Sequence, residues 1–160
     1  MSKQLHSIGG IVYHIWYDNQ PRFLIIKRHA RSKKIEWVAP KWKSEPNETP
    51  QQTCLREIYE EAWIDSWYLH VESQLGTVTI KNINFWHWYH EKDVTYYLVR
   101  HNGPIDQVHI QAVEWFIGVY KRATIQDITG LIIYPSMRDI FRKAYSLIQS
   151  TWSNTSSSSY

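Results

Sequence analysis

Strand-like segments alternate with two amphipathic helical segments along this 160-residue chain, and this alternation constrains the fold more than any other feature. The strand-like segments are short runs rich in branched and aromatic residues, which favour β-structure. They are residues 11–15, 23–26, 71–80, 94–99 and 113–117. Because strands and amphipathic helices are interleaved, we expect an α/β sandwich whose sheet is covered on both faces.

Two segments carry helix signals. Thr49 is predicted to be the N-cap of the first helix, with Pro50 at the first helical position and Gln52 completing a capping box. The second predicted helix covers residues 136–149 and follows a proline. The apolar stripes of the two helices are Leu55, Ile58 and Ala62, and Ile140, Ala144, Leu147 and Ile148.

The composition predicts one soluble domain. With 43% hydrophobic and 21% charged residues, the chain is neither disordered nor collagen-like. No apolar run approaches the roughly 20 residues of a membrane span, so we expect no membrane partner. Residues 1–150 are predicted to form the domain, and the serine-rich residues 151–160 a disordered tail. The N-terminus shows no secretory or transit pattern, which makes the cytoplasm the default location.

Three carboxylates share one face of the first predicted helix. Glu57, Glu60 and Glu61 stand at positions i, i+3 and i+4. Like charges this close repel one another. Such a face is therefore either solvated surface or a binding site for a hard divalent cation, because Mg²⁺ prefers carboxylate oxygens and waters and is completed by substrate phosphates. The helix alone leaves both interpretations open.

The residues around these carboxylates resemble the signature of the Nudix hydrolase family. Glu48, seven further residues, and then Arg-Glu-Ile-Tyr-Glu-Glu at 56–61 match every charged position of that signature. Residues 37–41, Trp-Val-Ala-Pro-Lys, are similar to the segment that precedes it in the family. The resemblance covers nearly the whole chain apart from the tail. It implies an α/β/α sandwich with a mixed β-sheet, and metal-dependent hydrolysis of a nucleoside diphosphate linked to another moiety.

The resemblance also implies roles for individual residues. Glu57, Glu60 and Glu61 would be catalytic and would hold Mg²⁺ or Mn²⁺. The backbone carbonyl of Lys41 would be a further metal ligand. Glu48 and Arg56 would form a supporting ion pair that braces the loop against the helix.

Other residues are candidates for contact with substrate. Residues 92–98 are similar to a strand of the diadenosine tetraphosphate hydrolase branch, which implies that Lys92 contacts phosphate and that Tyr96 lies near a nucleobase. Lys41 and Lys43 are cations beside the signature that could meet polyphosphate charge. His109 occupies a position where many relatives place a glutamate. It could accept a proton near neutral pH, although a single strand histidine is more often structural.

Three functions remain open at this point. The preferred substrate is a dinucleoside polyphosphate such as diadenosine tetraphosphate, and the closest alternative is a nucleoside triphosphate pyrophosphohydrolase of the sanitising type. A nucleic-acid-binding module is the alternative from another class, because the aromatic cluster at 85–90 could stack on bases. The basic residues are interleaved with acidic ones and the net charge is only +3, which argues against a nucleic-acid partner.

Both glycines of the family signature are tryptophan here, at Trp42 and Trp63. The chain has 9 Trp and 6 Gly, whereas average usage of roughly 7% would give about eleven Gly. A GGA codon becomes UGA by one base change. We hypothesise that UGA encodes glycine in the source, so that Trp42, Trp63, Trp16, Trp67 and Trp86 are glycine in the natural protein. If Trp42 and Trp63 are genuine, a catalytically impaired Nudix fold becomes an alternative.

Overall fold

The computed structural model describes residues 5–30, 34–83, 89–110 and 116–157. Their strands form a seven-stranded sheet with the order β3-β2-β1-β6-β5, in which β4 also pairs with β1 and β7 with β2. β1 and β6 are parallel and the other pairs are antiparallel, so the sheet is mixed. The strands are β1 (Leu5–Ile15), β2 (Pro21–His29), β3 (Ile35–Val38), β4 (Lys41–Lys43), β5 (Leu69–Ile83), β6 (Tyr89–His101) and β7 (Phe116–Ala123).

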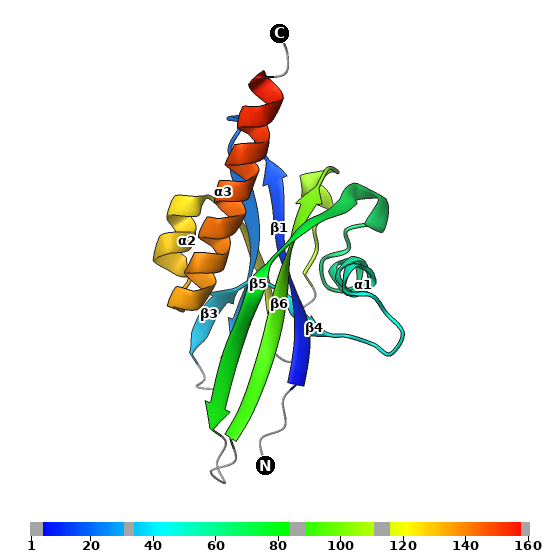
Figure 1. Ribbon diagram of the computed structural model, residues 1–160, viewed down its shortest axis with the longest axis vertical. Coiled ribbons are helices and arrows are strands. Elements are labelled where there is room, and N and C mark those ends of the chain that lie inside the picture. The colour runs from blue at the N-terminus through cyan, green and yellow to red at the C-terminus, as the bar shows by residue number, and fades with distance from the viewer. Residues whose placement is uncertain (1–4, 31–33, 84–88, 111–115, 158–160) are drawn as a thin grey trace.

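Helices cover both faces of this sheet (Figure 1). Helix α1 (Pro50–Ala62) lies on one face, whereas α2 (Ile125–Leu131) and α3 (Pro135–Ser157) lie on the other. Each layer has its own apolar core: Cys54, Ile58 and Ala62 of α1 pack in one cluster, and α2 and α3 contribute to the second cluster. The expected α/β/α sandwich with a mixed sheet is confirmed.

The start of α1 follows the sequence prediction in detail. The backbone N–H of Gln52 donates to Thr49 Oγ1 at 3.2 Å, and the backbone N–H of Thr49 donates to Gln52 Oε1 at 2.9 Å. Pro50 occupies the first turn, where no intrahelical donor is needed. The helix ends at Trp63, which adopts the left-handed conformation with φ 58° and ψ 29°. Between these two ends, Cys54, Ile58 and Ala62 form the buried side of α1 that faces the sheet.

The structure differs from the prediction in element lengths. β5 and β6 are longer than expected because they pair with each other along their whole length, from Leu69–His101 to Ile83–Tyr89. The short helix α2 was not predicted, although Thr124 and Asp127 form a capping box that the sequence contains. β3 and β4 were also missed. Of the predicted strand 113–117, residues 113–115 lie outside the described residues, and β7 begins at Phe116.

Helix α3 continues to Ser157 and thus includes most of the segment expected to be a disordered tail. No glycine or proline follows Pro135 to end the helix. Each further residue can therefore add one more backbone hydrogen bond, and the helix extends into the serine-rich segment. The expected helix end at residue 149 is therefore corrected. Among the helices described, none is both long and apolar enough to cross a bilayer.

Replacing Thr49 with alanine tests the cap of α1. Loss of the side-chain acceptor is expected to cost about 1 kcal/mol, which lowers the melting temperature of a domain of this size by about 2–4 °C. Gln51→Ala, at an exposed position in the first turn of the same helix, is the control and should leave the melting temperature unchanged or raise it slightly. Equal melting temperatures for the Thr49 and Gln51 variants would contradict the assigned cap.

Candidate active site

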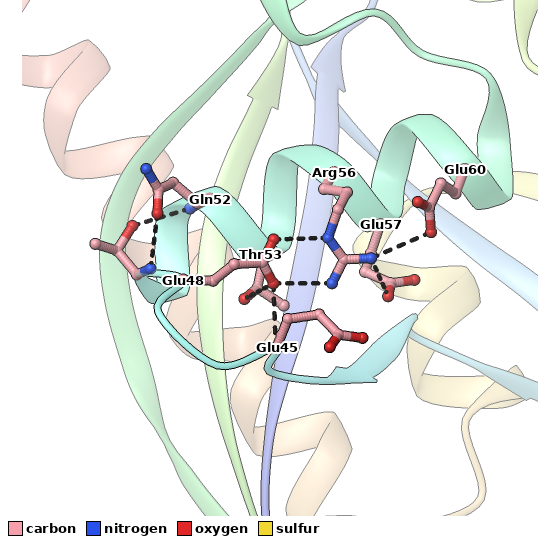
Figure 2. A network of polar contacts seen from close by, with 8 residues as sticks. Glu45, Glu48, Gln52, Thr53, Arg56, Glu57 and Glu60 are labelled. Carbon is pink, nitrogen blue, oxygen red and sulfur yellow. Dashed lines mark hydrogen bonds and ion pairs between the residues drawn. The ribbon is translucent and has the colours of Figure 1, made fainter.

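The guanidinium of Arg56 lies at the centre of a carboxylate cluster formed by α1 and the loop before it (Figure 2). Its Nε donates to Glu48 Oε2 at 2.6 Å and its Nη2 donates to Glu48 Oε1 at 2.9 Å, so the pair is bidentate. The remaining nitrogen, Nη1, donates to Glu57 Oε1 at 2.8 Å and to Glu60 Oε2 at 3.2 Å. One cation therefore holds three carboxylates together.

Glu48 connects the loop to the helix. Besides Arg56, its carboxylate accepts from the Thr53 hydroxyl at 3.1 Å and from the backbone N–H of Glu45 at 3.2 Å. The hydrogen bonds from Arg56 lower the pKa of Glu48 to about 2, and the same contacts raise the pKa of Arg56. The ion pair predicted between Glu48 and Arg56 is present in the structure.

The three carboxylates of the predicted metal site differ in their surroundings. Glu60 is exposed, Glu57 is partly buried, and Glu61 points inward so that its Oε2 is buried with no hydrogen-bond partner in the described structure. Burial raises the pKa of Glu57 even though Arg56 opposes the shift. Burial raises the pKa of Glu61 to about 7; the neighbouring indole N–H of Trp42 opposes this shift in part, and the charges of Glu57 and Glu60 add to it.

The side chains are not arranged around a common metal position. Within the described part of the chain, no group of three His, Cys, Asp or Glu residues converges as metal ligands. Glu57 and Glu60 are turned toward Arg56 instead. The residues nevertheless fit a hard divalent cation, because three carboxylates share one helix and the buried Oε2 of Glu61 lacks a partner that a cation would supply.

β4 places its residues next to the first strand. Lys41 pairs with Gly9, and the backbone N–H of Gly10 donates to the carbonyl of Pro40 at 3.0 Å. Lys41 is half-buried and Lys43 is exposed. Trp42, between them, is only 5% exposed and packs in the same apolar cluster as the inner face of α1.

The structure does not group Lys92 or Tyr96 with these carboxylates. Tyr96 is 2% exposed and belongs to the apolar cluster under α2 and α3, on the sheet face opposite α1. Its ring fills the space above Gly9, and burial raises its pKa to about 12. Tyr96 is therefore part of the core in this structure, and its contact with a base stays a prediction. Strand alternation places the half-buried Lys92 on the same face as Tyr96.

His109 lies at the C-terminal end of α1, beside Ala62 and Trp63. Its backbone N–H donates to the carbonyl of Ala62 at 3.1 Å, and its ring contacts that of Trp63 with 4.6 Å between centroids. These contacts are structural, and a catalytic role for His109 stays a prediction.

Sequence reasoning missed two features of the site. The first is the contact of Arg56 with Glu60, although the i, i+4 spacing of these two residues could have indicated it. The second is the burial of Glu61 next to Trp42. No pattern in the sequence signals that burial, because it depends on how β4 lies against α1.

The comparisons with known proteins agree with this architecture. The NUDIX domain family model matches residues 9–117, more than half of the chain. Among solved structures, a C. elegans Ap4A hydrolase binary complex is similar with a TM-score of 0.72 and 22% identity, over 91% of this chain and 98% of that chain. The E. coli dihydroneopterin triphosphate pyrophosphohydrolase gives a TM-score of 0.65 and 19% identity, over 91% and 97%.

A third similar structure is the NUDIX domain of Shewanella oneidensis NrtR complexed with ADP ribose, with a TM-score of 0.64 and 18% identity over 89% of each chain. At these identities the structures support the fold alone. No curated protein matches the sequence. From the family model and the charged signature on α1, the chain belongs to the NUDIX domain family. It is a Nudix hydrolase, a pyrophosphohydrolase of a family that generally uses divalent metal cations.

The depressed pKa of Glu48 predicts a pH dependence of stability. A carboxyl whose pKa is lower in the folded state stabilises the fold above its unfolded pKa, and this contribution is lost as the pH falls through the folded value of about 2. We expect Glu48→Gln to lower the urea midpoint at pH 7, with the difference from the parent shrinking below roughly pH 4. Glu45→Gln, in the same loop, is the control. A difference that does not change between pH 7 and pH 3 would contradict this account.

Proposed function

We propose that this Nudix hydrolase cleaves a dinucleoside polyphosphate such as diadenosine tetraphosphate, with Mg²⁺ or Mn²⁺ as cofactor. The observation that carries the proposal is the carboxylate face of α1. Glu57 and Glu60 contact Arg56 there, and Glu61 lies on the same face with its Oε2 buried. The similarity to the C. elegans Ap4A hydrolase supports the choice of substrate. The E. coli dihydroneopterin triphosphate pyrophosphohydrolase keeps a nucleoside triphosphate as the alternative substrate.

The metal ligands would be the carboxylates of Glu57, Glu60 and Glu61 and the backbone carbonyl of Lys41. A bound cation would supply positive charge to the phosphates and would make an attacking water molecule more acidic. Burial raises the pKa of Glu61, so this carboxyl is the one whose charge a bound cation would change most. A nearby cation favours the charged form of this carboxyl.

Arg56 has two separate functions in this proposal. Its bidentate pair with Glu48 uses Nε and Nη2, whereas Glu57 and Glu60 share only Nη1. The two carboxylates can therefore turn to a cation while the pair with Glu48 keeps the loop attached to the helix. Lys43, exposed in β4, adds positive charge beside the site for the polyphosphate.

An assay of both substrate classes tests the proposal. Purified protein with Mg²⁺ should hydrolyse diadenosine tetraphosphate faster than nucleoside triphosphates, measured by chromatography of the nucleotide products. The reverse order would favour the triphosphate alternative. Salt-dependent binding to single-stranded nucleic acid that Glu60→Gln leaves unchanged would favour the binding module instead.

Neutralising the carboxylates should abolish hydrolysis without unfolding the protein. Glu60→Gln and Glu61→Gln are each expected to lower kcat by roughly 10²-fold or more, because a metal ligand contributes several kcal/mol to stabilising the transition state. Asp139→Asn on α3, on the opposite face of the sheet, is the control and should retain parent activity. Parent-like kcat in both glutamine variants would show that these carboxylates do not carry the reaction.

Removal of the metal gives an independent test. A chelator should stop hydrolysis, and excess Mg²⁺ or Mn²⁺ should restore it. Because a ligand that binds the folded state stabilises it, cation at about 100 times its Kd should also stabilise the protein by about 2.7 kcal/mol, measured as a rise in melting temperature. Glu57→Gln should reduce that rise. An equal rise in the parent and this variant would place the bound cation elsewhere.

A further inference from the structure

Trp63 has a backbone conformation that its side chain disfavours. Its φ of 58° lies in the left-handed region, where a Cβ crowds the following carbonyl. Among the described non-glycine residues, only Asn19 and Asn47 share a positive φ. Asparagine tolerates this conformation and a bulky residue does not.

The surrounding structure imposes this conformation. The backbone N–H of Trp63 closes α1 by donating to the carbonyl of Tyr59 at 2.9 Å, and the next residue, Ile64, is buried in the core. Position 63 must therefore turn the chain directly from the helix into the core. The indole itself contributes little, since it is 53% exposed and has one ring contact in the described structure, with His109. Glycine would keep these backbone contacts without the strain.

Trp42 occupies space beside the carboxylates. It pairs with Ile8 in the sheet, and its ring lies so close to Gly10 that a Cβ there would come within 3.1 Å. Its indole N–H faces Glu61 and lowers the pKa of this carboxyl in part, against the larger effect of burial. The indole therefore lies against the carboxylate that a cation would need to contact.

We infer that positions 42 and 63 are glycine in the protein as its source makes it, and that Trp42 obstructs the cation site at Glu61. The obstruction rests on the proposed function, whereas the glycine at position 63 does not. If the source decodes UGA as glycine, a translation that reads UGA as tryptophan gives tryptophan at both positions. Of the described tryptophans, only Trp63 has a positive φ, and position 42 is inferred instead from its place beside Glu61. Trp16 and Trp67 show neither feature, and Trp86 lies outside the described residues.

The codons and the natural polypeptide test the first part directly. Codons 42 and 63 should be UGA, whereas codon 37 should be UGG because Trp37 matches the tryptophan of the family segment that precedes the signature. Mass spectrometry of the protein isolated from its source should then give glycine at both inferred positions. UGG at either codon, or tryptophan in the natural peptide, would overturn the inference for that position.

The strain at position 63 is tested by comparing glycine with alanine. Both substitutions remove the indole, so their difference isolates the backbone. Trp63→Gly should have a folding equilibrium constant about 5- to 30-fold higher than Trp63→Ala. Tyr59, one turn earlier in α1 and also 53% exposed, is the matched control. There alanine should be favoured over glycine by about 5-fold. The same preference for alanine at both positions would overturn the assigned strain.

The obstruction by Trp42 is tested by cation binding, measured calorimetrically with Mg²⁺ and Mn²⁺. Trp42→Gly should bind the cation about 10-fold more tightly than the parent, whereas Trp42→Phe, which keeps a bulky ring, should bind as the parent does. Phe23→Gly is the stability control, since it also removes a buried strand aromatic. Unfolding of Trp42→Gly to the extent seen for Phe23→Gly, or unchanged binding, would overturn the obstruction. Tighter binding without hydrolysis of either nucleotide class would contradict the proposed function instead.

Discussion

The contact between Arg56 and the carboxylates around it is the interaction on which the candidate site depends. Three glutamates from one loop and one helix turn repel one another unless a cation lies between them, and the guanidinium supplies that charge. Its fork geometry also separates two tasks: two nitrogens hold Glu48, and the third is shared by Glu57 and Glu60. The loop is therefore attached by bonds that a metal ion need not break.

The sequence predicts the parts of the site that depend on local geometry. The cap at Thr49 sets where α1 begins, and helical spacing then places Glu57, Glu60 and Glu61 on one face. The ion pair of Glu48 and Arg56 follows from the family signature, and the structure contains it. These features need only neighbouring residues or a fixed spacing, so tertiary packing does not alter them.

Features that depend on packing could not be predicted in the same way. Tyr96 and Tyr97 are adjacent in β6 but lie in opposite cores, and the pattern of the strand does not say which face α1 will cover. The burial of Glu61 likewise depends on β4, a three-residue strand without a sequence signal of its own. Helix α3 extends beyond its apolar stripe because nothing in the sequence ends it.

The two signature tryptophans show how a local conflict can carry information about the chain itself. A folded protein tolerates strain where function or packing compensates for it. Trp63 has a strained backbone and an exposed ring, and Trp42 is well packed but lies against Glu61, a predicted metal ligand. Packing does not compensate for the strain at the exposed Trp63, whereas at the buried Trp42 the cost falls on the proposed cation site. Glycine would relieve the strain at position 63 and remove the ring beside Glu61 at position 42. The simplest physical account of this site is therefore a fold that evolved around glycine at positions 42 and 63.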